Sequence, residues 1–233
     1  METLVELRKV DKVYENGVAE QVLFDVDLSI RDRDFASLVG PSGSGKTTLL
    51  NIIGLLDTPT DGEVIVGGRD VSVLDEDARA QLRRGYLGFI FQFHHLLPGF
   101  SVLDNVLMPC RIIGRECEEE ARSRAISMLE EVGLSDKIHS HPDQLSGGQQ
   151  QRVAVVRAIV NEPDLVLADE PTGSLDSESS KAVMDLIRRI NDETGSAFII
   201  VTHDLDLAET TDGIIELRDG RIIRDDRTIT RSS

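Results

Sequence analysis

A glycine-rich segment at residues 40–47 carries the residue types that bind phosphate. Its sequence, GPSGSGKT, follows an apolar run (35–39) and precedes TTLLNII, whose apolar residues recur with helical spacing. Glycines let successive backbone N–H groups and the helix N-terminus face negative charge. Lys46 is expected to reach the β- and γ-phosphates of a nucleotide, and Thr47 to ligate Mg²⁺. The residues predicted to bind the nucleotide here are Gly40, Pro41, Ser42, Gly43, Ser44, Gly45, Lys46, Thr47 and Thr48.

Two acids at the end of an apolar strand form a second candidate group. The stretch LVLADE ends in Asp169 and Glu170. Asp169 is placed to hold Mg²⁺, and Glu170 to polarise an attacking water. Acids at a strand end are weak evidence alone. Together with the phosphate-binding segment they predict ATP hydrolysis with Mg²⁺.

The sequence LSGGQ at residues 145–149 supplies a third group. Ser146, Gly147 and Gly148 open a helix that begins near Gln149, which creates a second helix N-terminus able to face an anion. Taken alone, the five residues LSGGQ also fit the ordinary start of a capped helix. In the order in which it occurs here, it resembles the signature of the ATP-binding-cassette (ABC) ATPases. That resemblance implies a homodimer in the ATP-bound state, in which two cassettes pair head to tail and sandwich two ATP molecules.

The same resemblance assigns roles to further residues. Tyr14 matches the aromatic residue that stacks on adenine, although it also fits a surface tyrosine. Gln92 matches the glutamine that senses Mg²⁺ and the attacking water, and residues 174–176 (SLD) match a loop that crosses the dimer interface. His203 matches the switch histidine on the γ-phosphate. The predicted sets are catalytic Glu170, His203 and Gln92; metal-binding Thr47, Gln92 and Asp169; and nucleotide-binding Tyr14, Ser146, Gly147, Gly148 and Gln149, besides the glycine-rich segment.

Composition limits the function classes. The 233 residues include 25 Lys and Arg against 42 Asp and Glu, so the net charge is −17. A phosphate-backbone binder needs a basic face, and we therefore expect no nucleic-acid partner. The longest apolar stretches, such as residues 49–56, fall far short of the roughly 18 that suggest a membrane span. No secretory signal begins the sequence. We expect a cytoplasmic protein.

The pattern along the chain indicates an α/β fold. Short strands at 4–10, 22–30, 35–39 and 63–67 predict a mixed or antiparallel sheet near the N-terminus. Residues 118–132 have helical spacing and stop at Gly133. Beyond residue 147, apolar strands at 165–168 and 197–201 lie between helices at 149–160, 178–194 and 205–210, which is typical of a covered parallel sheet. A final hairpin is expected to turn at Asp219-Gly220.

The resemblance completes this architecture. It implies a phosphate-loop NTPase of the ABC type, with a RecA-like parallel-sheet core, an N-terminal antiparallel β subdomain and an inserted helical subdomain. We predict a single ABC transporter ATP-binding domain over residues 3–233, with the helical subdomain at about 93–147 carrying the signature.

Four stretches narrow the resemblance within the family. They are 51–62 (NIIGLLDTPTDG), 91–98 (FQFHHLLP), 104–109 (DNVLMP) and 168–176 (ADEPTGSLD). They resemble the ABC ATPases of lipoprotein release, macrolide export and cell division. The implied function is an ATP-hydrolysing subunit at the cytoplasmic face of the inner membrane, bound to integral membrane subunits of the LolC/LolE type. A cell-division ATPase that regulates a cell-wall complex is the main alternative, and an export ATPase of the MacB type is another.

The segment 89–100 contains four of the seven phenylalanines: Phe89, Phe91, Phe93 and Phe100. Aromatic residues are usually core. They also anchor partner helices in grooves, and the resemblance places a membrane subunit's helix here. We expect this segment to serve both purposes, with Leu96 and Phe100 as partner anchors.

Overall fold

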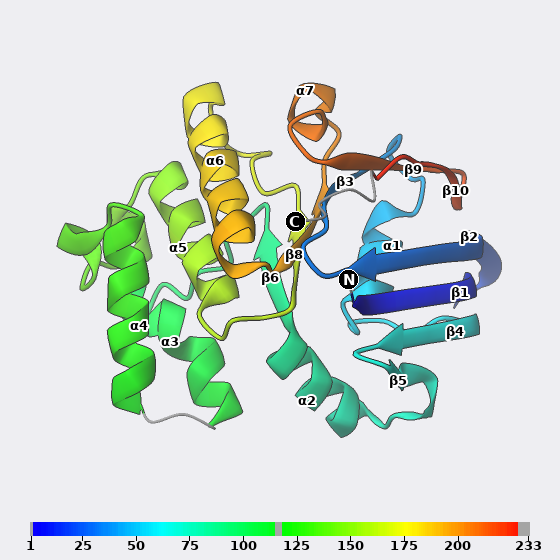
Figure 1. The fold of residues 1–233 in the computed structure, drawn as a ribbon, viewed down its shortest axis with the longest axis horizontal. Coiled ribbons are helices and arrows are strands. Elements are labelled where there is room, and N and C mark those ends of the chain that lie inside the picture. The colour runs from blue at the N-terminus through cyan, green and yellow to red at the C-terminus, as the bar shows by residue number, and fades with distance from the viewer. Residues whose placement is uncertain (1, 115–117, 228–233) are drawn as a thin grey trace.

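The N-terminal strands form an antiparallel sheet in the order β2-β1-β4-β5. The computed structural model describes residues 2–114 and 118–227 (Figure 1). Alternate side chains of the second strand, Val26, Leu28 and Ile30, are buried, as expected of a sheet with one wet face. The strands are β1 (Thr3–Asn16), β2 (Val18–Arg31), β4 (Asp61–Val66) and β5 (Arg69–Asp70).

The second sheet has six strands in the order β10-β9-β3-β8-β7-β6. Strands β6, β7, β8, β3 and β9 run parallel, and β10 pairs antiparallel with β9. The bounds are β3 (Phe35–Val39), β6 (Leu87–Phe91), β7 (Leu165–Asp169), β8 (Ala197–Val201), β9 (Gly213–Arg218) and β10 (Arg221–Asp225). The grouping of residues 35–39 with the N-terminal sheet was wrong. All five residues of β3 are buried, which suits an inner strand of a covered parallel sheet.

Helices flank the parallel sheet: α1 (Lys46–Ile53), α2 (Glu76–Tyr86), α6 (Ser177–Thr194) and α7 (Leu205–Ala208). The sequence pattern did not predict α2, because none of its residues is buried. This helix begins at Asp75, whose side chain accepts a hydrogen bond from the N–H of Ala78, and it ends with Arg83 and Arg84. Its sequence signal is therefore capping and charge rather than an apolar stripe.

Three helices, α3 (Val102–Ile113), α4 (Glu118–Glu131) and α5 (Gly147–Ile159), pack together beside the parallel sheet (Figure 1). The helix expected at 118–132 is confirmed, and Gly133 follows it with φ +71°. One hydrophobic cluster joins these helices to the sheet, for example through Val106, Val155 and Ile200. A second cluster fills the space between the two sheets and α1. The limits 93–147 for a separate subdomain stay a prediction.

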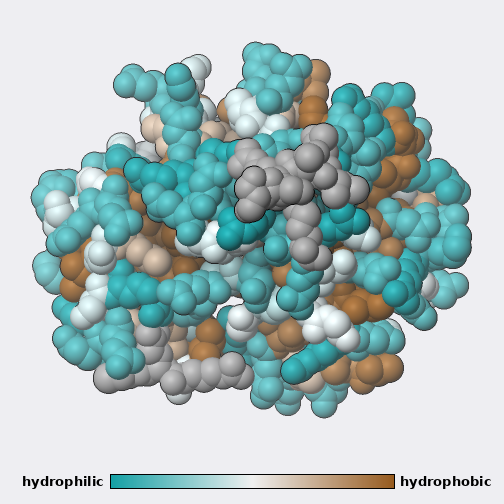
Figure 2. Space-filling model, viewed as in Figure 1, coloured by the Kyte–Doolittle hydropathy of each residue, from teal (hydrophilic) through white to brown (hydrophobic). Residues whose placement is uncertain are grey.

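The C-terminal hairpin turns at Asp219 and Gly220, as predicted. Both have positive φ, 46° and 73°, which a two-residue type I′ turn requires. Hydrophilic side chains cover most of the face seen in Figure 2, and the brown apolar groups lie scattered between them. Among the helices of residues 2–114 and 118–227, none is long and apolar enough to cross a membrane.

Candidate functional site

A cavity of about 510 Å³ opens where α1, β7 and β8 meet. Parallel strands place their carboxyl ends at one edge of a sheet, and this is where such folds bind ligands. Residues distant in sequence therefore come together here. The lining consists of Val22, Gly40, Ser42, Gly43, Gly45, Lys46, Thr47, Thr48, Asp169, Glu170, Val201 and His203.

The loop before α1 has the shape of a phosphate cradle. Gly45 is the N-cap of α1, at φ +100° and with no side-chain hydrogen bond to the helix. The first N–H groups of the helix are thus left for a ligand. A Cβ atom at Gly40 would lie 2.0 Å from the carbonyl oxygen of Leu217, so only glycine fits there.

Lys46 lies inside the cradle. Its Nζ donates to the carbonyl oxygens of Gly40 and Pro41, each at 2.9 Å. No ion pair with an acid joins it within the described part of the chain. Two neutral acceptors hold this ammonium group in place, and its charge is not neutralised.

Asp169 and Thr47 face the cavity from two sides and present hard oxygen ligands. Burial raises the pKa of Asp169, the neighbouring Glu170 raises it further, and Lys46 opposes both. A divalent cation relieves the repulsion between two such carboxylates. A carboxylate and a hydroxyl are ligands that Mg²⁺ accepts alongside phosphate oxygens. The donor set therefore fits a magnesium ion.

His203 and Glu170 contact each other directly. The Nδ1 atom of His203 lies 2.8 Å from Oε1 of Glu170, and this hydrogen bond raises the pKa of His203. The histidine side chain is 75% exposed, whereas the glutamate is 20% exposed. Glu170 also has φ +49°, an unusual backbone conformation for a side chain of this kind.

Gln92 does not line the cavity. Its side-chain nitrogen Nε2 lies 2.9 Å from the position that a Cβ of Gly173 would occupy, and its backbone carbonyl oxygen accepts from the hydroxyl of Ser174 at 3.2 Å. The glutamine and the loop 173–176 are therefore packed against each other. The catalytic and metal-binding roles predicted for Gln92 stay predictions.

The segment 146–149 also lies outside the cavity lining. Ser146 caps α5: its hydroxyl accepts from the N–H of Gln149 at 3.3 Å, and its own N–H donates to the Gln149 side chain at 2.9 Å. This reciprocal arrangement is a capping box. Ser146 and Gly147 are exposed. The structure separates this helix start from the chain's own phosphate cradle.

Tyr14 lies beside the cavity rather than in its lining. Its hydroxyl donates to Oδ2 of Asp57 at 2.8 Å, and it also contacts the hydroxyl of Thr48. Burial and the bond to Asp57 raise the pKa of Tyr14. Sequence reasoning did not single out Asp57 or its other partner, Lys12. No sequence signal marks them, because the contact of Asp57 with Tyr14 joins residues 43 positions apart.

Comparison with known proteins gives the family. The family model described as ABC transporter matches residues 23–173. The chain belongs to the ABC transporter family. This ABC ATPase is 50% identical over 222 residues to the lipoprotein-releasing system ATP-binding protein LolD of Anaeromyxobacter dehalogenans, which is 95% of this chain and 93% of the relative. LolD of Pseudomonas syringae pv. tomato is 46% identical over 221 residues, 94% of this chain and 97% of that one.

Solved structures share the fold of this ABC ATPase. The dimeric, post-hydrolysis structure of the ATP-binding cassette MJ0796 bound to ADP and Pi has a TM-score of 0.88 and 41% identity, covering 97% of this chain and 100% of that one. CbiO1 of Clostridium perfringens has a TM-score of 0.87 at 24% identity, covering 97% of this chain and 89% of that one, which shows the fold alone. The predicted fold class, ATPase activity and family resemblance are confirmed.

Proposed function

We propose that this ABC ATPase is the ATP-hydrolysing subunit of a lipoprotein-releasing complex at the cytoplasmic face of the inner membrane. The observation that carries the proposal is the 50% identity over 95% of the chain to a protein named for that system. The cavity is consistent with it, since one pocket holds the lysine, hydroxyl, acids and histidine that the chemistry needs.

ATP is the substrate that this cradle accepts. The N–H groups at the start of α1 and the ammonium of Lys46 bind the phosphates, and Lys46 exchanges its two carbonyl partners for phosphate oxygens. Thr47 and Asp169 would hold Mg²⁺, together with Gln92 as the family resemblance implies. When bound, Mg²⁺ neutralises negative charge on the phosphates.

Glu170 acts as the general base. Its carboxylate accepts a proton from the water that attacks the γ-phosphate. In the structure this carboxylate is bonded to His203. When the exposed histidine exchanges Glu170 for a γ-phosphate oxygen, both carboxylate oxygens of Glu170 become free to accept from the water. This exchange couples arrival of the third phosphate to activation of the water.

A second copy of the chain completes each site. The start of α5 (residues 146–149) is exposed and lies outside the chain's own cavity. In a head-to-tail pair it faces the ATP on the other subunit, where its N-terminal N–H groups meet the γ-phosphate. The two MJ0796 structures of the same fold are described as dimers, which supports this proposal.

An apolar groove of about 420 Å³ offers a dock for the membrane subunits. Leu56, Leu97 and Ile112 line it and are 49%, 42% and 55% exposed. Leu96, by contrast, is partly buried against the core of the helices and does not line the groove. We therefore replace Leu96 with Leu97 and Ile112 as the proposed anchors for an apolar helix of LolC/LolE-type subunits.

Co-purification tests the dock. Leu97→Ala with Ile112→Ala removes two exposed anchors, and we expect loss of the membrane subunits with ATP binding retained, because hot-spot truncations cost about 2 kcal/mol or more. Val18→Ala is the matched control, since Val18 is 84% exposed but lies on the N-terminal sheet. If the double variant gives an unchanged yield of complex, the membrane subunits bind at another surface and not in this groove.

Reconstitution tests the function itself. The chain and its membrane subunits are placed in proteoliposomes with a lipid-modified protein, and the release of that protein to a soluble acceptor is measured with MgATP. Release that needs ATP and fails with Glu170→Gln supports the proposal. ATP hydrolysis without release would contradict lipoprotein release and favour the cell-division type of complex.

A further inference from the structure

Lys12 is a basic side chain buried against the loop that follows α1. Its side chain is only 10% exposed, and its Nζ lies 2.6 Å from Oδ1 of Asp57 and 2.8 Å from the carbonyl oxygen of Thr58. An ammonium group is costly to bury unless it is paired and hydrogen-bonded. This one is both, in a chain that has only five lysines.

Asp57 uses its two oxygens for two different partners. Oδ1 accepts from Lys12, and Oδ2 accepts from the hydroxyl of Tyr14 at 2.8 Å. Burial alone would raise the pKa of Asp57, but the bonds from Lys12 and Tyr14 outweigh it and lower the pKa. The carboxylate of Asp57 therefore stays ionised and holds Tyr14 by its phenolic hydroxyl.

Lys12 also contacts the ring of Tyr14. Its Nζ lies 4.7 Å from the ring centroid, over one face. One face of the ring is therefore covered by Lys12. The hydroxyl end is fixed by Asp57 at the same time, which restricts rotation of the ring.

The loop that carries Asp57 is tied to α1 on one side and to β1 on the other. The backbone N–H of Asp57 donates to Asn51 in α1 at 3.2 Å. Further along, the N–H of Thr60 donates to Asp11 at 2.8 Å, and the Thr60 hydroxyl accepts from the N–H of Val13 at 2.9 Å. The helix that begins at the cradle thus also sets the place of Tyr14.

We propose that the Lys12–Asp57 pair is a positioning device for the base of the nucleotide. It holds the ring of Tyr14 at a fixed place relative to the phosphate cradle, with one face presented to the adenine. This rests on the proposed function, in which the cradle binds ATP, and on the stacking of Tyr14 on adenine that the ABC resemblance implies. Lys12 and Asp57 act through Tyr14 and do not touch the phosphates.

The proposal predicts a split between two ligands. Asp57→Asn and Lys12→Met are each titrated with ATP and with inorganic tripolyphosphate, which has the phosphates but no base. We expect the Kd for ATP to rise about 3- to 10-fold, because base stacking is weakened, while the Kd for tripolyphosphate stays the same. An equal loss for both ligands would overturn the proposal, because the pair would then support the whole site.

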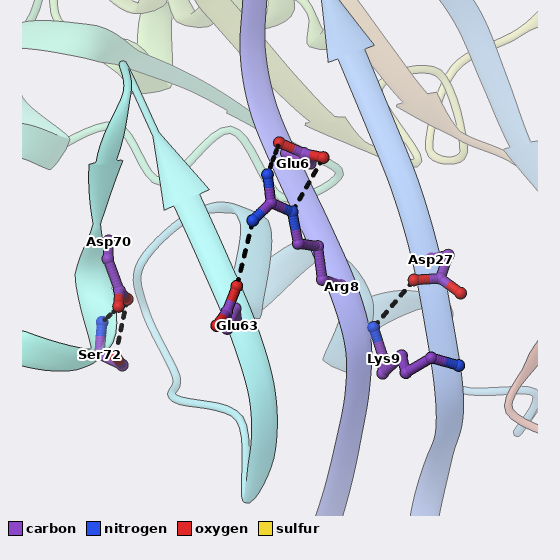
Figure 3. A network of polar contacts seen from close by, with 7 residues as sticks. All are labelled: Glu6, Arg8, Lys9, Asp27, Glu63, Asp70 and Ser72. Atoms are coloured by element: carbon purple, nitrogen blue, oxygen red, sulfur yellow. Dashed lines mark hydrogen bonds and ion pairs between the residues drawn. The ribbon is translucent and has the colours of Figure 1, made fainter.

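The matched control is Glu63→Gln on the same sheet. Figure 3 shows Arg8 between Glu6 and Glu63, where the Arg8–Glu63 contact is 3.3 Å and both side chains are more than half exposed. Loss of such an exposed ion pair changes the stability of the fold by little. We expect no change in either Kd for this variant, and a loss of ATP binding as large as that of Asp57→Asn would overturn the proposal.

A double-mutant cycle separates this inference from the proposed function. Tyr14→Phe keeps the ring but removes the hydroxyl that Asp57 holds, so its effect on ATP binding should not add to that of Asp57→Asn. Additive effects would overturn the proposal. If Tyr14→Ala weakens ATP binding and Asp57→Asn does not, the positioning role fails and the adenine site stands. If Tyr14→Ala has no effect, the adenine site itself fails.

Discussion

The N-termini of α1 and α5 differ in the backbone of the N-cap and in what satisfies the first N–H groups. Gly45 is left-handed at φ +100°, whereas Ser146 is extended at φ −68° and ψ 161°. At α1 the N-cap is Gly45, which has no side chain to bond the helix N–H groups. At α5 the N-cap is Ser146, whose hydroxyl and partner Gln149 close a capping box. The start of α1 has no side-chain cap, whereas at α5 the capping box takes the N–H of Gln149 and not those of Gly147 and Gly148.

The surroundings of the two helix starts differ as well. Lys46, Asp169, Glu170 and His203 share the cavity at α1. The first turn of α5 carries two glycines and two glutamines, and no charged residue. The α1 end thus has the groups for binding and hydrolysis within one chain. The α5 end offers only backbone dipoles, and in our proposal it acts on the phosphate that a second copy of the chain supplies.

The largest expected effect tests the base at the α1 end. Glu170→Gln keeps the shape of the side chain but removes its ability to accept a proton, so the hydrolysis rate should fall about 10²- to 10⁴-fold. ATP binding should persist. Phosphate release and nucleotide titration on one preparation measure both. If the variant still hydrolyses ATP at the normal rate, Glu170 is not the general base.

Lys46→Ala should act on binding instead. The variant loses a charged donor to the phosphates, and such bonds contribute about 1.5–3 kcal/mol, so the Kd for ATP should rise roughly 10- to 100-fold. Titration with ATP and with tripolyphosphate should give the same loss, in contrast to Asp57→Asn. Unchanged affinity for both ligands would show that the cradle binds phosphate without this lysine.

Ser146→Ala should separate the two helix starts. Loss of the cap costs about 1 kcal/mol of stability. Hydrolysis should also fall, because α5 loses the bond that defines its first turn. ATP binding by the monomer should be unchanged, since Ser146 does not line the cavity. Weaker binding by the isolated monomer would mean that both helix starts serve the same nucleotide.

The smallest expected effect is the pH dependence of stability that comes from the His203–Glu170 pair in the cavity at α1. Glu170 raises the pKa of His203, so the pair stabilises the folded chain below the ordinary histidine pKa. That contribution disappears as the pH rises through the raised pKa. The histidine is mostly exposed, so the stabilisation should be below about 1 kcal/mol, or at most about 2–4 °C in Tm. Wild type and His203→Gln should differ in Tm at pH 5.5 and converge at pH 8.5. An equal difference at both values would exclude the pair as its source.

Sequence patterns predicted the elements that carry an apolar period or a motif. The helix α4, the inner strands and the hairpin at Asp219 follow from local signals, as does the glycine-rich segment of the cavity. His203 was assigned by resemblance, and Val22 and Val201 of the lining were not predicted. The helix α2 was missed because none of its residues is fully buried and only Leu82 and Tyr86 pack against the core. The sheet to which residues 35–39 belong was missed because strand pairing is decided by contacts distant in sequence.

Side-chain partners were the least predictable part of the site. Leu96 and Leu97 are adjacent leucines, but only packing shows that the first faces the core and the second the groove. The contact of Asp57 with Tyr14 spans 43 positions of sequence, and no spacing rule points to it. Gln92 was found by resemblance, and its place beside Gly173 rather than in the cavity depends on the loop conformation.

The mass of the Glu170→Gln protein with and without MgATP tests most directly whether the α5 end serves a second molecule. Because this variant binds ATP without hydrolysing it, the sandwiched pair should accumulate. Light scattering at tens of micromolar protein should show a doubling of mass when MgATP is added. Adding Ser146→Ala to Glu170→Gln should reduce that doubling. A protein that stays monomeric at saturating MgATP would contradict the account, because each α1 site would then have to act alone.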